Sequence, residues 1–331
     1  MLGSRVVRVV DRRELVLTAA AAPLALAAGR AFAAAGGGID PVALVTADLE
    51  SHVAVVDLAT GRVRSRLETA PGPRSIESVH GLDAVVAHTV SGVVSLLATR
   101  PLGLRRELDG FGAPRYTAAH PRLRIAYVTD SAAEQVVVLD VERARVVGRA
   151  QVPGPARHLS ISPDGRTLWA ALGSKAERVA LLDASDPRRP RLVRTIAPPF
   201  LAHDVVFAPR GGLVWVTAGT GRRIALYRAG TREVSRLLAA DRAPQHVAFA
   251  GDLALVASGD DGTVRVHGLE GDLLRQARVP SGSYNVTFGG RRAVTPSLSR
   301  GTVALLDERG RVRTVRTIAR AAHDACVVIA S

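Results

Sequence analysis

One unit of about 40 residues recurs seven times along this chain of 331 residues. Its clearest mark is a five-residue segment with apolar side chains at alternating positions, found at 53–57, 94–98, 136–140, 179–183, 224–228, 264–268 and 303–307. The alternation has a period of two, and tight turns such as Pro163-Asp164-Gly165-Arg166 separate the segments. A blade of four short strands cannot bury both of its faces alone. The repeat therefore predicts an all-β, seven-bladed β-propeller with four-stranded antiparallel blades.

The register of the copies also predicts how the ring closes. The first copy starts at Pro41 with the second strand of a blade, whereas residues 323–330 match the first strand of the other copies. We expect this C-terminal strand to complete the first blade, because closure removes the exposed sheet edge that an open ring would leave. Residues 41–331 would then form one domain. The single cysteine, Cys326, excludes an internal disulfide.

Part of the third copy resembles a known repeat. Residues 127–130 read Tyr-Val-Thr-Asp, and with the strand at 136–140 and the Ser-Pro-Asp-Gly turn at 162–165 they resemble the YVTN β-propeller repeat. The resemblance covers residues 41–331 and implies a scaffold without implying an activity. Trp169 and Trp215 occupy the repeat position of Tyr127. Since large aromatic side chains dominate core burial, we expect all three to pack between blades.

The N-terminal 33 residues are similar to a twin-arginine export signal. Arg12 and Arg13 precede a mildly apolar, alanine-rich run at 15–28, and Ala31-Phe32-Ala33 offers small residues to a signal peptidase. The run is shorter than the roughly 20 apolar residues that a membrane span needs, so we expect no transmembrane span in the mature protein. Residues 34–40 would be a linker. The resemblance implies an exported protein, which is periplasmic, associated with the cell wall or extracellular.

The strong positive charge does not by itself indicate nucleic acid as a partner. The formal net charge is +14, and Lys175 is the only lysine among 44 basic residues. The arginines are scattered over turns and strand ends, and aromatic residues, 4% of the chain, do not interleave with them as a base-stacking surface requires. We therefore expect a monomer whose partner is a small molecule or a protein. Adhesion to an acidic wall polymer or to lipid headgroups stays open.

Motifs of the common enzyme classes are absent from the sequence. It contains no Gly-x-Ser-x-Gly elbow, phosphate-binding glycine loop, Cys-x-x-Cys-His or His-Glu-x-x-His. Residues 258–262 begin like a sialidase Asp-box, but Arg265 replaces the expected aromatic residue. Residues 154–165 are similar to a stretch of propeller-type phosphogluconolactonases, but Ala171-Leu172-Gly173 stands where that family has an Asn-Glu pair. The sequence favours a non-catalytic binding or scaffold protein.

Alignment of the copies gathers polar residues at the two positions that open the innermost strand of each blade. These pairs are Arg74-Ser75, Arg115-Tyr116, Arg157-His158, His203-Asp204, Gln245-His246, Tyr284-Asn285 and His323-Asp324. In a propeller they surround one mouth of the central channel, and the loops after the second strands add Asp48, His88, Asp130, Asp260 and Asp261. A single histidine at this position could simply satisfy backbone groups. Because different polar types at equivalent positions suit an asymmetric ligand, we expect the set from Arg115 to Asp324 to bind one.

Two kinds of chemistry are open at this mouth. Imidazole and carboxylate groups suit a divalent metal such as zinc, copper or manganese, with His203, His246 and His323 as candidate ligands. The alternative function is a lactonase-like hydrolase or lyase for a small anionic or lactone substrate, with one of these histidines as general base and Arg115 or Arg157 holding the negative charge. An enzyme should hold one histidine against a carboxylate in a deep pocket. A binding protein should present a broad, wet face.

The export signal makes a direct prediction about the mature chain. Protein recovered outside the cytoplasm should lack residues 1–33, because a signal peptidase would cleave after Ala31-Phe32-Ala33. N-terminal sequencing of that protein measures the cleavage site. Recovery of a chain that still begins with Met1 would contradict the prediction.

Overall fold

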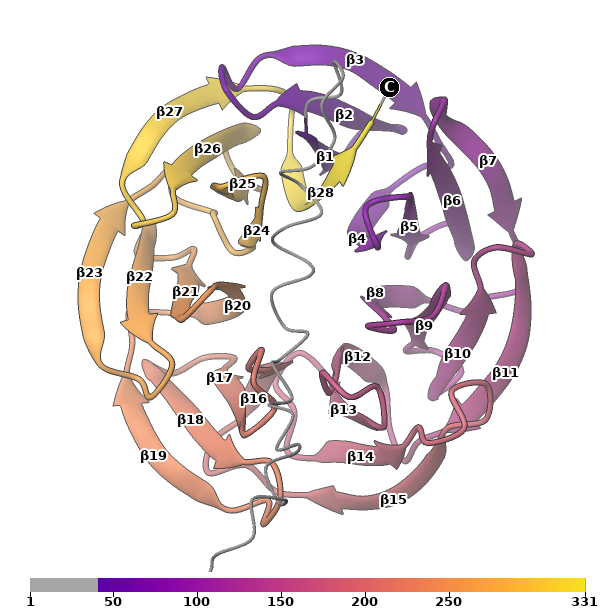
Figure 1. Cartoon of the computed structure of the whole chain (residues 1–331), viewed down its shortest axis with the longest axis vertical. Coiled ribbons are helices and arrows are strands. Elements are labelled where there is room, and N and C mark those ends of the chain that lie inside the picture. Colours follow the sequence, from indigo (N-terminus) through magenta and orange to yellow (C-terminus); the bar gives the residue numbers. More distant parts are fainter. Residues whose placement is uncertain (1–40, 331) are drawn as a thin grey trace, which may run out of the picture.

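Seven four-stranded antiparallel sheets stand in a ring around a central channel in the computed structural model, which describes residues 41–330 (Figure 1). The predicted seven-bladed β-propeller is confirmed. The predicted export signal and linker lie outside the described residues. Among residues 41–330, no helix is long and apolar enough to cross a membrane.

The blades are numbered along the chain, and the four strands of each run from the innermost outward. Blade 1 contains β28 (Ala322–Ile329), β1 (Pro41–Ala47), β2 (His52–Asp57) and β3 (Val63–Glu68). Blade 2 contains β4 (Pro73–Val79), β5 (Asp83–His88), β6 (Val93–Thr99) and β7 (Leu102–Leu108). Blade 3 contains β8 (Pro114–Ala119), β9 (Ile125–Asp130), β10 (Gln135–Asp140) and β11 (Arg145–Gln151). Blade 4 contains β12 (Ala156–Ile161), β13 (Thr167–Leu172), β14 (Val179–Asp183) and β15 (Arg191–Ile196).

The remaining three blades follow the same order. Blade 5 contains β16 (Ala202–Phe207), β17 (Leu213–Ala218), β18 (Arg223–Arg228) and β19 (Val234–Ala239). Blade 6 contains β20 (Pro244–Ala250), β21 (Leu253–Ser258), β22 (Thr263–Gly268) and β23 (Leu273–Arg278). Blade 7 contains β24 (Thr287–Gly289), β25 (Arg292–Ser297), β26 (Thr302–Asp307) and β27 (Val312–Thr317).

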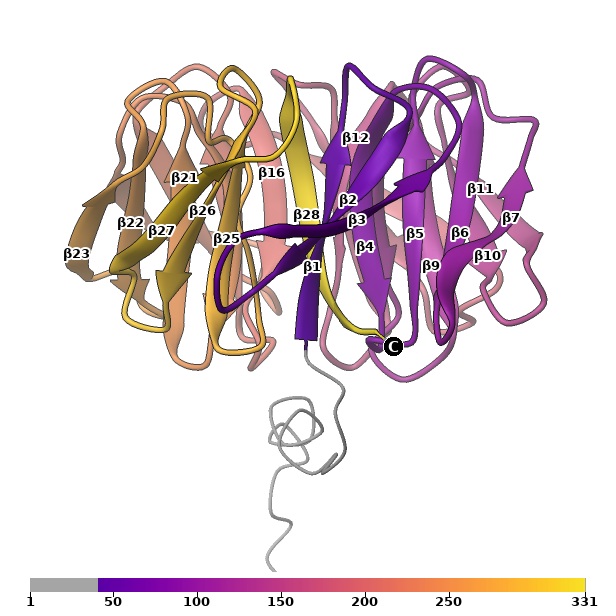
Figure 2. The ribbon, with the colours of Figure 1, turned by 90° about the horizontal axis from the view of Figure 1, so that it is seen from above.

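The C-terminal strand closes the ring as the sequence predicts. β28 pairs antiparallel with β1, with Leu44 opposite Cys326 and Val42 opposite Val328, so blade 1 takes strands from both ends of the chain (Figure 2). Each inner strand begins on one face of the disk and runs toward the other. The first residues of all seven inner strands therefore lie at the same mouth of the channel.

The hydrophobic core is divided into seven clusters, one at each interface between neighbouring blades. The middle strands are buried on both faces, as in β9 and β10, because each blade packs against a neighbour on either side. Trp169 of blade 4 packs edge-on against Phe207 and Tyr227 of blade 5, with ring centroids 5.9 and 5.6 Å away. Such contacts bury large apolar area between blades.

The other two large aromatic residues of the repeat also reach the next blade. Trp215 of blade 5 lies 6.1 Å from Phe249 of blade 6 between ring centroids. The hydroxyl of Tyr127 in blade 3 donates a 3.0 Å hydrogen bond to the carbonyl of Pro187 in blade 4. The prediction that these aromatic residues pack between blades is confirmed.

Removal of β28 should destroy the closed ring. Deleting residues 322–331 leaves blade 1 with three strands, exposes an edge of β1, and takes Ala322, Ala325 and Val327 out of the cluster between blades 7 and 1. We expect aggregation or loss of the cooperative thermal transition, measured by calorimetry and light scattering. Deleting Ser331 alone should leave the melting temperature unchanged. A monomeric long truncation that melts like the intact protein would disprove this role of β28.

Candidate ligand site at the mouth of the central channel

A β-bulge at the start of the inner strand directs the predicted site residues toward the channel. In blades 1 to 6 the pairing of the first and second strands shifts register at this point, for example between Ala156 and Leu159 in blade 4 and between Ala202 and Val205 in blade 5. A bulge adds residues to one strand and re-aims their side chains. In these six blades the two positions that open the inner strand lie within or next to the bulge, whereas Tyr284 and Asn285 of blade 7 precede β24 and do not open it, contrary to the prediction from the sequence.

Threonines of the second strands satisfy backbone groups that the bulges leave unpaired. The hydroxyl of Thr129 accepts a hydrogen bond from the N–H of Tyr116 at 3.0 Å and donates one to the carbonyl of Arg157 in the next blade at 2.6 Å. Thr46 in blade 1 and Thr217 in blade 5 make the same two kinds of contact. Each of these threonines therefore couples the mouth residues of its own blade to those of the next.

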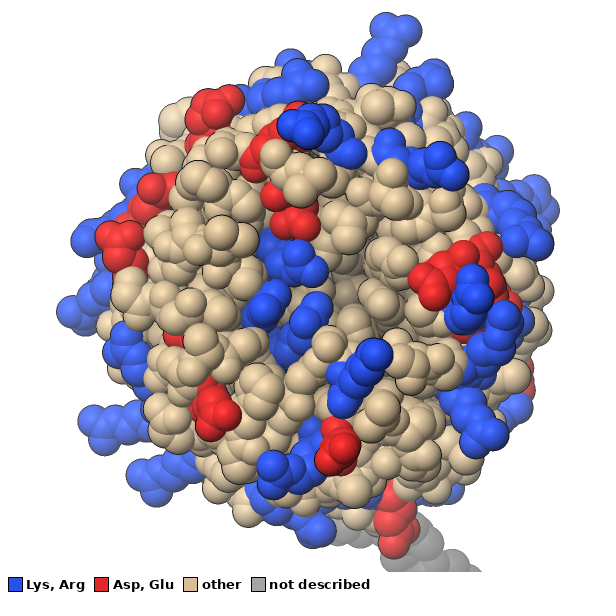
Figure 3. Space-filling view, turned by 180° about the vertical axis from the view of Figure 1, so that it is seen from behind, with Lys and Arg blue, Asp and Glu red and all other residues tan. Residues whose placement is uncertain are grey.

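The mouth opens into a cavity of about 320 Å³ along the channel axis. Since alternate residues of a strand face the same side, the inner strands line this cavity in two layers. The mouth layer contains Ser75, Tyr116, His158, Asp204, His246 and Asp324, and the inner layer contains Glu77, Ala118, Ser160, Val206, Ala248 and Thr287. The molecular surface is visibly hollowed at the centre of this face (Figure 3).

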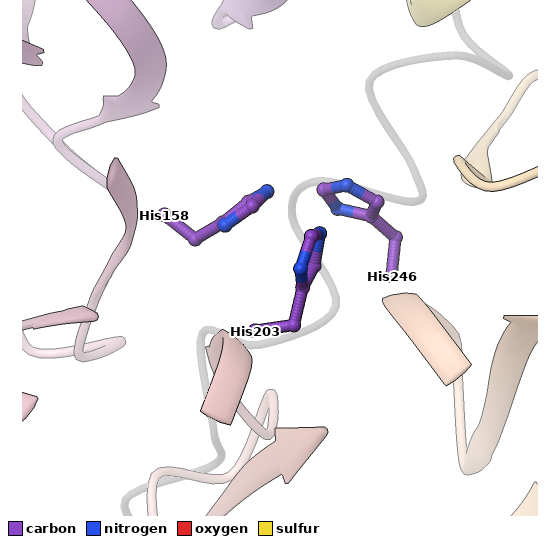
Figure 4. Close-up of side chains that lie close together, drawn as sticks. All are labelled: His158, His203 and His246. Carbon is purple, nitrogen blue, oxygen red and sulfur yellow. The ribbon is translucent and has the colours of Figure 1, made fainter. Parts of the chain in front are cut away.

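Three histidines at the mouth converge. His158, His203 and His246 come from the inner strands of blades 4, 5 and 6, and their rings point toward one another (Figure 4). One ring nitrogen of each lies within 4.8 Å of those of the other two. The ring of Tyr116 packs on His158, with centroids 3.8 Å apart. Four consecutive blades thus contribute rings to a single cluster.

Hydrogen bonds orient two of these rings. Nδ1 of His203 lies 3.0 Å from the carbonyl oxygen of Ser174 and must donate to it, which leaves the lone pair on Nε2. Nδ1 of His246 lies 3.3 Å from Oδ2 of Asp204. Nε2 of His203 and both ring nitrogens of His158 are buried without a hydrogen-bond partner among residues 41–330. The cluster therefore presents unused imidazole nitrogens at one point.

The surroundings keep two of the rings neutral. Burial lowers the pKa of His203 to about 3, and the adjacent His246 and the charge of Arg157 contribute to this shift. Burial also lowers the pKa of His158 well below its ordinary value, with further lowering by His203 and His246. Neutral imidazole is the form that binds a metal ion or accepts a proton.

Three further predicted mouth residues, His323, Asn285 and Tyr284, have partners within the protein. Nδ1 of His323 lies 2.6 Å from the carbonyl oxygen of Arg74, and His323 is not among the three histidines whose ring nitrogens converge. The amide of Asn285 donates to the carbonyl of His323 at 2.7 Å, and the hydroxyl of Tyr284 donates to Asp260 at 2.9 Å. Sequence reasoning proposed His203, His246 and His323 as metal ligands, whereas the structure brings His158 to the first two.

Loop residues expected at this face also serve the scaffold. Asp130 accepts hydrogen bonds from the backbone of Gly112 and Ala113, and His88 contacts the hydroxyl of Ser95 at 2.8 Å. Asp48 forms an ion pair with Arg74 at 3.1 Å. Asp260 and Asp261 both lie beside Arg242. These side chains shape the edge of the mouth, and each already has a partner within the protein.

Two half-buried carboxyl groups line the channel, and sequence reasoning missed one of them. Desolvation raises the pKa of Glu77 to about 8, and the neighbouring Asp324 contributes to the shift. Desolvation likewise raises the pKa of Asp324 to about 6, although the nearby His246 opposes the shift. Glu77 is the only acidic residue at its position in the seven copies, which is the signal that could have revealed it.

Comparison with known proteins supports the fold. No family model and no curated protein matches the chain. A functionally unknown protein from Desulfotomaculum acetoxidans matches with a TM-score of 0.76 at 12% identity, over 88% of this chain and 99% of that one. Kuenenia stuttgartiensis hydrazine synthase matches with a TM-score of 0.67 at 18% identity, over 78% and 89% of the two chains. Apo AztD from Citrobacter koseri matches with a TM-score of 0.67 at 12% identity, over 89% and 99%.

The desolvated carboxyl group of Glu77 should make stability depend on pH. Its pKa in the folded protein, about 8, lies above its ordinary value of 4.5, so the folded protein retains a proton that the unfolded chain releases. This contribution is fully present below about pH 4.5 and is lost as pH rises to about 8. Gln in the variant Glu77→Gln cannot ionise and avoids the cost of a desolvated charge, so at pH 8 this variant should melt roughly 3 °C or more above the wild type.

Thermal melts between pH 4.5 and pH 8 measure this difference. Glu142→Gln, an equivalent change on an exposed turn, should follow the wild type throughout. If the melting temperatures of all three proteins change with pH in parallel, Glu77 has no such role.

Proposed function

We propose that this protein is a binding propeller that holds one divalent transition-metal ion on His158, His203 and His246. The observation that carries the proposal is the convergence of three ring nitrogens within 4.8 Å of one another. In a tetrahedral zinc site, ligand nitrogens roughly 2.0–2.1 Å from the metal lie about 3.3 Å apart. Small rotations of the three histidine side chains, whose rings already point toward one another, would bring their nitrogens to that separation.

The contacts around the cluster resemble those of metal ligands in proteins. A ligating histidine commonly donates its second ring N–H to a carboxylate or a backbone carbonyl, which fixes its tautomer and strengthens it as a ligand. His246 has Asp204 in this position and His203 has the carbonyl of Ser174. Three protein ligands leave a fourth position for water, a substrate or a group of a partner protein.

The chemistry of the ligands restricts the metal. Three imidazole ligands suit zinc, copper or nickel, whereas calcium and magnesium require several oxygen ligands. Manganese, which favours carboxylate and water, fits this cluster less well than zinc or copper. We therefore propose zinc or copper as the bound ion.

The N-terminal resemblance extends the proposal to the location of the protein. A twin-arginine signal and a YVTN-type propeller support a protein that is exported to the periplasm, the cell wall or the medium. The cluster takes its ligands from three blades, so it exists only in the folded chain. Export after folding would therefore carry a finished site out of the cytoplasm.

A second candidate function is a hydrolase or lyase for a small lactone or anionic substrate. The observation that favours it is the carboxylate of Asp204, 3.3 Å from Nδ1 of His246, next to a cavity of about 320 Å³. A carboxylate in this position orients an imidazole as a general base. Turnover of small lactones by the wild type that is lost in Asp204→Asn would support it, and no turnover would reject it.

Metal binding is tested with a triple variant. Wild-type protein dialysed against zinc or copper and then against buffer should retain one metal ion per chain, measured by elemental analysis. His158→Ala/His203→Ala/His246→Ala should retain none, because it lacks all three imidazole ligands. Removing the metal from the wild type with a chelator should lower its melting temperature by several degrees.

The matched control is His80→Asn, which changes an exposed histidine with a positive φ of 56° that asparagine tolerates. This variant should retain the metal. Equal metal contents in the wild type and the folded triple variant would reject the proposed site.

A further inference from the structure

We infer that Arg74, Arg115 and Arg157 form a second binding site at this mouth, for a small oxyanion that carries at least two negative charges. We call these three residues the arginine rim. They open the inner strands of three consecutive blades, β4, β8 and β12. Anion binding at the arginine rim does not require the metal of the proposed function.

The backbone holds the arginine rim in place. The hydroxyl of Thr46 donates to the carbonyl of Arg74 at 3.1 Å, and Nδ1 of His323 contacts the same oxygen. The hydroxyl of Thr129 donates to the carbonyl of Arg157. Basic side chains gather along one side of the central hollow on this face (Figure 3). The side chains therefore start from fixed positions in a bulged strand, each directly before a residue that lines the cavity, Ser75, Tyr116 or His158.

The charges of the arginine rim are only partly balanced within residues 41–330. Asp48 pairs with Arg74, whereas neither Arg115 nor Arg157 forms an ion pair with a described carboxylate. The guanidinium of Arg157 lies 6.0 Å from the centre of the Tyr116 ring. The Nε atoms of all three arginines are buried without a hydrogen-bond partner in the described part of the chain. A partly buried guanidinium charge without a counterion, and a buried N–H without an acceptor, both raise the free energy of the folded protein. A bound anion would offset this cost because it supplies negative charge and hydrogen-bond acceptors.

The three guanidinium groups also act on one another. Burial lowers the pKa of Arg115, and the charges of Arg157 and Arg74 lower it further. Of the three, only Arg74 has a carboxylate partner among the described residues, so the guanidinium groups of Arg115 and Arg157 stay without an ion pair at the mouth. Asp204 and Asp324 line the cavity beside them. A doubly charged anion would pair with both guanidinium groups.

The geometry of guanidinium narrows the ligand to an oxyanion. Its planar fork donates two parallel hydrogen bonds to carboxylate or phosphate oxygens. The adjacent cavity of about 320 Å³ admits a small molecule. Phosphate and a short dicarboxylate share the required charge and oxygen pattern. A metal ion on the histidines would add positive charge nearby and should strengthen anion binding.

Calorimetric titrations with inorganic phosphate and with malonate test the inference on chelator-treated protein at constant ionic strength. We expect one anion per chain, and at least tenfold weaker binding to Arg115→Gln/Arg157→Gln. The matched control is Arg210→Gln/Arg236→Gln, which removes the same net charge from two exposed ion pairs on other blades. It should bind as the wild type does. If the Gln variant fails to fold, Arg115→Lys/Arg157→Lys retains the charge but lacks the fork, and should bind at least threefold more weakly.

The outcomes separate this site from the metal site. The triple histidine variant should still bind the anion within about twofold of the wild type, since the arginines supply the contacts. Tighter binding of phosphate would identify a phosphoryl ligand, and tighter binding of malonate a dicarboxylate. If neither anion binds the wild type, or if the rim variant and its control bind equally, the inference is wrong.

Discussion

The hydroxyl groups of Thr46, Thr129 and Thr217 each bridge two blades at the point where an inner strand bulges. A bulge frees backbone groups that would be costly to bury unpaired, and the threonine supplies their partners. Blades 2, 4 and 6 bulge at the same point with Ala87, Ala171 and Ala257 in the threonine position, so the threonines do not create the bulge. In blades 1, 3 and 5 they fix the backbone of the mouth residues in two neighbouring blades at once.

Charge is ordered along the channel axis as a consequence. Guanidinium groups open the inner strands, neutral histidines lie at the mouth, and carboxyl groups with raised pKa values, Glu77 and Asp324, lie beside and below them. Burial weakens solvent screening at the arginines, the histidines and the carboxyl groups. A ligand bound at one of these sets would therefore interact electrostatically with the other two. A cation near the histidines would lower the cost of ionising the two carboxyl groups. The same cation would add to the positive charge around the arginines and so strengthen their attraction for an incoming anion.

The repeat is enough to predict the number of blades, the closing strand and the packing of Tyr127, Trp169 and Trp215, since all of these follow from period and register. It also places the polar residues at one mouth. It cannot show which of them meet, because the bulge changes side-chain direction within each inner strand. His323 shares its repeat position with His203, and both bond a backbone carbonyl through Nδ1, yet only His203 meets two other histidines. Glu77 escapes prediction because its desolvation, which makes it unusual, is a property of the closed ring.

β28 belongs both to the closure of the ring and to the wall of the site. It pairs with β1 through most of its length and brings Asp324 into the cavity and His323 against the backbone of Arg74. Any ligand that contacts these residues binds only the closed ring, so its binding energy adds to the free energy that opposes opening. A small molecule bound at the mouth would therefore stabilise the closed disk. After its release, the ring would open most easily where β28 pairs with β1, the pairing that joins the two ends of the folded chain.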